Sequence, residues 1–108
     1  MISSTTPLFG LTMEIIRKIN GVFAGHPNIV CVILYGSRAK GNYTTGSDID
    51  LTLEGAGIKL EQLNSINNEL DDLLLPYTFD ISIFQQISNP DLLDHIKRVG
   101  KVFYKRED

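Results

Sequence analysis

Residues 34–54 read LYGSRAKGNYTTGSDIDLTLE, and this stretch decides the fold. An apolar run at residues 29–35 stops at a Gly-Ser pair (residues 36–37), and a polar loop follows it. Asp48 and Asp50 then open a second apolar run. Side chains that are two positions apart on a strand point to the same face of the sheet, so these two carboxylates lie side by side and repel each other. The pattern raises the question of what supplies the compensating positive charge.

The composition is that of an ordinary soluble globular domain. The chain has 108 residues, of which 43% are hydrophobic and 21% charged, and its formal net charge is −3. A general nucleic-acid binder usually has a strongly basic surface, so this charge argues against that class. The single cysteine, Cys31, cannot form an internal disulfide, which suits a reducing compartment. No apolar run approaches the ~20 residues that span a bilayer, and we therefore expect a cytoplasmic protein that does not contact a membrane.

The hydrophobic periodicity predicts helices around a small sheet. We expect residues 1–9 to be a flexible start and residues 10–108 to form a single domain. The predicted elements, in chain order, are a helix from residue 11, a strand at 29–35, a strand at 48–54, a helix at 58–75, a strand at 78–84 and a helix from 90 to 99. The fold class is therefore α/β (α+β), with helices flanking a mixed three-stranded sheet and KVFY at 101–104 as a candidate short fourth strand.

The strand–helix–strand unit at residues 48–84 predicts how the acidic residues meet. Such a unit forms a right-handed crossover, which makes its two strands parallel. Parallel neighbours align their starts, so Asp80 on the later strand is expected beside Asp48 and Asp50. Three carboxylates at one end of a sheet are costly without a counter-charge, which Mg²⁺ or Mn²⁺ would supply. Alternatively, the acids cap the sheet edge or pair with Lys and Arg side chains.

The Gly-Ser pair suggests a phosphate site. Gly36 lets the backbone approach a ligand closely, and the following amide groups and the Ser37 hydroxyl suit phosphate oxygens. Arg38 and Lys40 add positive charge within the same few residues. The alternative interpretation of GSRAKG is an ordinary turn with solvated basic side chains. Together with the acids, the phosphate interpretation favours transfer from a nucleoside triphosphate.

These features together resemble a known family. Gly36-Ser37, ten residues, Asp48-Ile49-Asp50 and a later strand aspartate resemble the nucleotidyltransferase fold of the DNA polymerase beta superfamily. The segment LYGSRAKGNYTTGSDIDL is similar to the signature of the minimal nucleotidyltransferases (MNT), short domains found beside all-helical HEPN proteins in prokaryotic toxin–antitoxin pairs. The ending HIKRVGKVFY is similar to their last helix and strand.

The resemblance implies a Mg²⁺-dependent transfer of AMP from ATP to a hydroxyl group, in the best understood relatives a tyrosine of the HEPN toxin. Asp48 and Asp50 would ligate a pair of Mg²⁺ ions, with Mn²⁺ as a substitute. Asp80 would complete one metal site and help to deprotonate the acceptor. The residues expected to bind the triphosphate are Gly36, Ser37, Arg38 and Lys40.

The length of the chain bears on the acceptor. A single core leaves few residues for a second substrate pocket, so we expect the acceptor surface to come from a HEPN-type partner or from a second copy in a homodimer. Two other functions stay open. The chain could be a non-catalytic, nucleotide-binding antitoxin that masks its toxin, or a nucleotidyltransferase that modifies a small molecule or an RNA end. Neither His26 nor His95 has a second potential ligand at the sequence spacing typical of a metal site, and both are interpreted as surface or helix-end residues.

Overall fold

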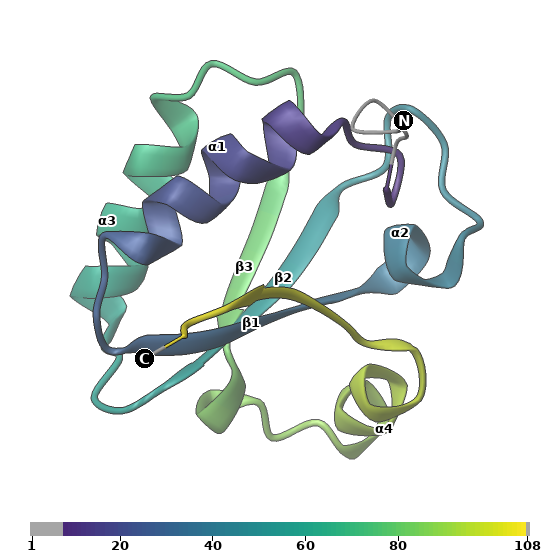
Figure 1. Cartoon of the computed structure of the whole chain (residues 1–108). Coiled ribbons are helices and arrows are strands. Elements are labelled where there is room, and N and C mark those ends of the chain that lie inside the picture. The colour runs from purple at the N-terminus through teal and green to yellow at the C-terminus, as the bar shows by residue number, and fades with distance from the viewer. Residues whose placement is uncertain (1–7, 108) are drawn as a thin grey trace.

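The computed structural model of the chain describes residues 8–107 (Figure 1). Most of the predicted flexible start, residues 1–9, therefore lies outside the described residues. The elements, in chain order, are α1 (Met13–Ala24), β1 (Ile29–Tyr35), α2 (Gly36–Lys40), β2 (Ile49–Gly55), α3 (Leu60–Asp71), β3 (Phe79–Ile83), the 3-10 helix η1 (Phe84–Gln86), α4 (Pro90–Val99) and β4 (Lys101–Lys105). No helix within residues 8–107 is long and apolar enough to cross a membrane.

The four strands form one mixed sheet in the order β3-β2-β1-β4. β2 and β3 are parallel, whereas β1 is antiparallel to both of its neighbours, β2 and β4. The predicted α/β fold class and the parallel crossover are therefore confirmed. The candidate fourth strand is also confirmed, since β4 pairs with β1 and forms one edge of the sheet.

The helices lie on both sides of this sheet (Figure 1). α1 and α3 cover one face, and η1 and α4 lie on the other side. Side chains of β2 alternate between the two sides of the sheet. Ile49, Leu51 and Leu53 point to one side and are fully buried in the core. Burial of each such side chain stabilises the fold by roughly 1.5–3 kcal/mol. The intervening positions of β2 carry the polar residues Asp50, Thr52 and Glu54, so this strand has one apolar side and one polar side.

Local signals explain several helix ends. The Thr12 hydroxyl caps α1 by accepting a hydrogen bond from the Ile15 amide at 3.2 Å. Asn89 caps α4 in the same way, and Pro90 occupies the first turn, where its missing N–H costs nothing. α3 is shorter than predicted and ends at Asp71, because the chain then turns and Leu74 adopts a positive φ of 57°. Leu74 is 88% exposed as a result.

β1 also differs in part from its prediction as a strand buried on both faces. It lies in the middle of the sheet as expected, but Val30 is 49% exposed. The pairing of β1 with β2 shifts register between Ile29 and Cys31, and this irregularity leaves Val30 outside the regular ladder.

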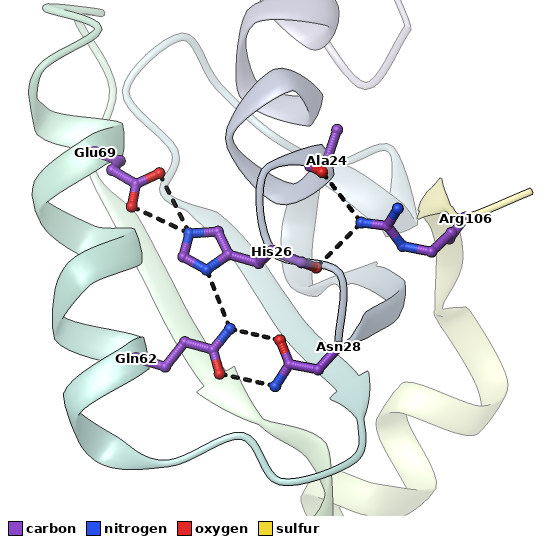
Figure 2. A network of polar contacts seen from close by, with 6 residues as sticks. All are labelled: Ala24, His26, Asn28, Gln62, Glu69 and Arg106. Atoms are coloured by element: carbon purple, nitrogen blue, oxygen red, sulfur yellow. Dashed lines mark hydrogen bonds and ion pairs between the residues drawn. The ribbon is translucent and has the colours of Figure 1, made fainter.

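A polar network closes the end of the sheet where β1 begins (Figure 2). The imidazole of His26 lies between two side chains of α3, with Nε2 at 3.1 Å from Glu69 Oε2 and Nδ1 at 3.1 Å from Gln62 Nε2. Gln62 also exchanges two hydrogen bonds with Asn28, of 2.9 and 2.7 Å. The interpretation of His26 as a surface residue is therefore wrong, because its ring joins the α1–β1 turn to α3.

The C-terminal strand is attached to the same turn. The Arg106 guanidinium donates to the carbonyl oxygens of Ala24 at 3.2 Å and His26 at 3.1 Å (Figure 2). It also donates to the Ile29 carbonyl at the start of β1. The three elements α1, α3 and β4 are thus joined by side-chain hydrogen bonds at the end of β1 that lies away from Tyr35.

We expect Gln62→Ala to lower the free energy of unfolding by about 1–2 kcal/mol, since it removes the hydrogen-bond partner of His26 Nδ1 and of the Asn28 side-chain oxygen. Asn64→Ala, at an exposed position of the same helix, is the control and should change the free energy of unfolding by less than about 0.5 kcal/mol. Urea denaturation measures both. Equal stability of the two variants would contradict a stabilising role for the network.

Candidate active site

Acidic side chains lie close together at one end of the sheet, where β1 ends and where β2 and β3 begin. Asp50 on β2 is directly opposite Asp80 on β3 in the parallel pair. Tyr35, the last residue of β1, is opposite Asp50 on its other side. These three residues form one row across the polar face of the sheet, and Asp48 immediately precedes β2. The register therefore places Asp80 beside Asp50, at the position that the crossover predicts.

The carboxylates of this row repel one another. Burial, and then the negative charges of Asp80 and Asp48, together raise the pKa of Asp50 from its ordinary value of 3.8 to about 6. Burial also raises the pKa of the Tyr35 phenol, so that side chain stays neutral beside the acids. Within residues 8–107, none of the three acids forms an ion pair with Lys, Arg or His. In this part of the chain, the alternative interpretation that the acids pair with Lys or Arg side chains is therefore not supported.

The same acids have the chemistry of an open cation site. In the described part of the chain, no three His, Cys, Asp or Glu side chains lie close enough together to hold a metal ion by themselves. Asp48 and Asp80 are exposed and Asp50 is half-buried, so their oxygens are accessible to a ligand. Mg²⁺ typically binds one or two carboxylates and completes its shell with waters and substrate phosphates. The donor set thus fits a Mg²⁺ ion that is bound together with a substrate.

The Gly36-Ser37 turn lies against this acidic row. Gly36 has a φ of 75°, in the left-handed region that favours glycine, and a Cβ at this position would collide with Asp50 Oδ2. The turn can therefore approach the acids only because it has no side chain here. Ser37 follows, and its hydroxyl makes no hydrogen bond with another residue of the 8–107 range. Lys40 is exposed in the last turn of α2.

Arg38 is the largest side chain that is fully buried, with only 2% of its surface exposed. Its guanidinium donates two hydrogen bonds to the Ser47 carbonyl, at 3.2 and 3.0 Å, and one to the Phe9 carbonyl at 3.0 Å. A longer contact of 3.4 Å reaches the Thr45 carbonyl. Arg38 therefore connects α2 to the loop that ends at Asp48 and to the N-terminal segment.

Two tyrosine rings complete the surroundings of this guanidinium. Its central carbon lies 5.4 Å from the centroid of the Tyr43 ring and 5.2 Å from that of Tyr77. Tyr43 belongs to the loop before Asp48, and Tyr77 precedes β3. One buried cation thus holds together the segments that lead into β2 and β3, the strands that carry the acids.

Sequence analysis missed one residue of this site, His95. Its Nε2 atom accepts a hydrogen bond of 3.0 Å from the Gly36 amide, and its ring packs edge-on against Tyr35 with a centroid distance of 6.1 Å. The interpretation of His95 as a helix-end residue is therefore wrong. No local pattern could have revealed the contact, because 59 positions separate the two residues.

A small mixed sheet with acids on adjacent strands, facing a Gly-Ser turn, defines a class of nucleotidyl-transferring proteins. Residues 17–108 match the family model of polymerase beta nucleotidyltransferases, and the chain belongs to this family. Comparison with curated proteins gives no significant match.

Solved structures with the same fold include several toxin–antitoxin complexes. The chain is 20% identical to one described as a toxin-antitoxin with AMP-PNP, covering 85% of this chain and 74% of that one with a TM-score of 0.70. A tri-AMPylated Shewanella oneidensis HEPN toxin in complex with MNT antitoxin gives 18% identity, 86% and 71% coverage and a TM-score of 0.64. The toxin-antitoxin MntA-HepT gives 18% identity, 88% and 74% coverage and a TM-score of 0.65. At these identities the similarity establishes the fold.

We expect Arg38→Lys to lower the free energy of unfolding by at least about 2 kcal/mol, because an ammonium group cannot replace the hydrogen bonds of the guanidinium to separate carbonyls. Lys40→Gln, two residues later on the exposed side of α2, should change it by less than about 0.5 kcal/mol. Thermal and urea denaturation measure the difference. A wild-type stability for Arg38→Lys would exclude the connecting role.

We expect Asp50→Asn to stabilise the metal-free protein at neutral pH and not in acid. The folded-state pKa of about 6 lies above the ordinary value of 3.8, so the wild type has its full stability below the lower value and loses it as the pH rises through 6. Because solvent screens this half-buried group, the gain at about pH 7.5 should be about 1 kcal/mol. Denaturation at about pH 4 and pH 7.5 tests this.

Asp71→Asn, at the exposed end of α3, is the control for the pH dependence. Its effect on stability should be nearly the same at both pH values, because no acidic row faces it. A gain for Asp50→Asn that does not depend on pH would show that the carboxylate is not destabilised by its charge.

Proposed function

We propose that this chain is a Mg²⁺-dependent nucleotidyltransferase that transfers AMP from ATP to a tyrosine hydroxyl of a HEPN-type partner and thereby acts as its antitoxin in the cytoplasm. The observation that carries the proposal is the register of Asp50 opposite Asp80, with Asp48 adjacent and the Gly36-Ser37 turn against them. Family membership supports nucleotidyl transfer. The fold shared with complexes of MNT and HEPN proteins supports the type of partner.

Asp48, Asp50 and Asp80 are the proposed holders of Mg²⁺. When bound, the cation neutralises the acids and the phosphate oxygens together and so favours the developing negative charge of the reaction. The raised pKa of Asp50 is consistent with this role, because it arises from burial and from the negative charges of Asp80 and Asp48, which a bound cation would offset. Because Asp48 and Asp80 are exposed, their carboxylate oxygens would be accessible to a cation and to a substrate.

The Gly36-Ser37 turn is the proposed cradle for the phosphates. The Ser37 amide and hydroxyl would donate hydrogen bonds to the phosphate oxygens, and Lys40, on the surface nearby, would add positive charge. We revise the expected role of Arg38, since its guanidinium already donates to carbonyl oxygens in a buried position. In the present proposal it orients the turn and the loop and does not contact the triphosphate.

Asp80 is the proposed base. It is exposed at the start of the edge strand β3, where an acceptor from another molecule can reach it. The carboxylate would take the proton of the acceptor hydroxyl, whose oxygen then forms a bond with the α-phosphorus of ATP. The bond from the α-phosphorus to the bridging oxygen breaks, and pyrophosphate leaves with that oxygen. The products are an AMP ester of the acceptor, pyrophosphate and a proton on Asp80 that is passed to water.

The test is transfer of label from α-³²P-ATP to a purified HEPN-type partner in the presence of Mg²⁺. We expect the wild type to label the partner on tyrosine, and Asp48→Asn and Asp50→Asn to abolish labelling while the complex still forms. Asp80→Asn should lower the rate by on the order of 10²-fold, as the loss of a positioned base does. Asp94→Asn, on the exposed surface of α4, is the matched control and should retain the rate.

The alternatives give different results in the same assay. Protection of cells by Asp48→Asn at wild-type levels, without labelling, would favour an antitoxin that masks its toxin. Labelling of RNA or of a small molecule, but not of the partner, would assign the other substrate class. Labelling of the chain itself would point to a second copy as the acceptor.

A further inference from the structure

We propose that His95 is a positioning residue that holds the Gly36-Ser37 turn in the conformation that binds nucleotide. The contact is specific, since the Gly36 amide donates to Nε2 of His95 at 3.0 Å. This inference rests on the proposed function for the role of the turn, but the contact itself involves none of the acidic residues.

The direction of the hydrogen bond defines the state of the imidazole. A backbone amide can only donate, so Nε2 must present its lone pair, and in the neutral ring Nδ1 then carries the proton. A protonated imidazole has donors on both nitrogens and would face the amide with an N–H group. The neutral ring with hydrogen on Nδ1 is therefore the form that supports the turn.

The turn needs an external support because it lacks a local one. Tyr35 precedes α2 in the N-cap position, and its side chain makes no capping hydrogen bond. Gly36 itself has a φ of 75°, a conformation that is not stabilised by any side chain of its own. The amide of Gly36 is instead satisfied by a residue of α4, and a buried amide without such a partner would cost on the order of 1–3 kcal/mol.

The imidazole also contacts an aromatic ring, and the helix that carries it is anchored in the fold. Its ring contacts the Tyr35 ring edge-on, with an interplanar angle of 81°. Ile96, the next residue on α4, is buried, and α4 is capped by Asn89 at its start. His95 therefore links α4 to the Gly36-Ser37 turn through its hydrogen bond. Its other contact, Tyr35, lies in the same row as Asp50 and Asp80.

Because of this contact, one hydrogen-bond donor of the turn is occupied while another stays available to a ligand. The Gly36 amide is occupied by His95, whereas the Ser37 hydroxyl is free of partners within residues 8–107. Phosphate oxygens would accordingly be bound by Ser37 and the amides after it, with Gly36 held in place behind them. His95 acts through the turn and does not touch the phosphates.

The test compares His95→Gln with His95→Phe. Glutamine can present a carbonyl oxygen to the Gly36 amide, whereas phenylalanine keeps an aromatic ring against Tyr35 and has no acceptor. We expect His95→Phe to weaken Mg²⁺-ATP binding about tenfold and His95→Gln to bind within about threefold of the wild type. Titration calorimetry measures the affinity, and Lys97→Gln, on the exposed side of α4, is the control.

A second measurement is independent of nucleotide binding. In ¹⁵N NMR spectra, the Gly36 amide should exchange slowly with solvent in the wild type and in His95→Gln, and at least about tenfold faster in His95→Phe. The ring nitrogens of His95 should report hydrogen on Nδ1. Hydrogen on Nε2, or an unchanged Gly36 exchange rate in His95→Phe, would overturn the proposed contact.

The two measurements separate this inference from the proposed function. If the wild type does not bind Mg²⁺-ATP at all, the proposed function fails, and the NMR result still decides whether His95 holds the turn. If His95→Phe loses the protection of Gly36 but binds nucleotide with wild-type affinity, the positioning role is wrong. A loss of affinity that is equal in both variants would also contradict it, because it would show that the acceptor atom is not what matters.

Discussion

The mutual repulsion of carboxylates at one edge of the sheet is the constraint on which this structure depends. Asp50 and Asp80 are directly opposite each other on parallel strands, where they cannot separate without breaking the ladder between β2 and β3. Burial, and then the negative charges of Asp80 and Asp48, raise the pKa of Asp50. A protein without a use for this arrangement would gain stability by removing a charge. The fold thus maintains an unfavourable charge pattern that a bound cation would relieve.

The basic residues near the acids have separate roles, which their similar charges do not suggest. Arg38 is buried and donates to backbone carbonyls, so its charge is used to order the loop before Asp48. Lys40 is exposed and available to a ligand. Because the guanidinium is enclosed by carbonyl oxygens and tyrosine rings, it orders the segments around the acids without neutralising them. Within residues 8–107, none of the three carboxylates forms an ion pair with a basic side chain.

The two ends of β1 show how a small sheet can combine rigidity with an exposed site. At its start, the network around His26 joins the turn after α1 to α3, and Arg106 joins it to the end of β4 (Figure 2). At its end, the chain enters a glycine turn that is supported by His95 from α4. Hydrogen bonds between distant segments therefore fix both ends of the strand, and the polar row lies on a scaffold that has little freedom to rearrange.

The sequence by itself determined the strand at 29–35 and a strand at 48–54, which the structure places one residue later at Ile49–Gly55. It also determined the parallel crossover and the placement of Asp80 beside Asp50, because alternation and crossover handedness are local or chain-order properties. It also indicated Gly36 through its position after a buried strand. The tertiary structure alone decided that Arg38 is buried and that His26 and His95 are hydrogen-bonded. It also decided that Leu74 is exposed. Burial and hydrogen-bond partners depend on which distant segments meet in space, and the spacing of residue types along the chain carries no record of those meetings.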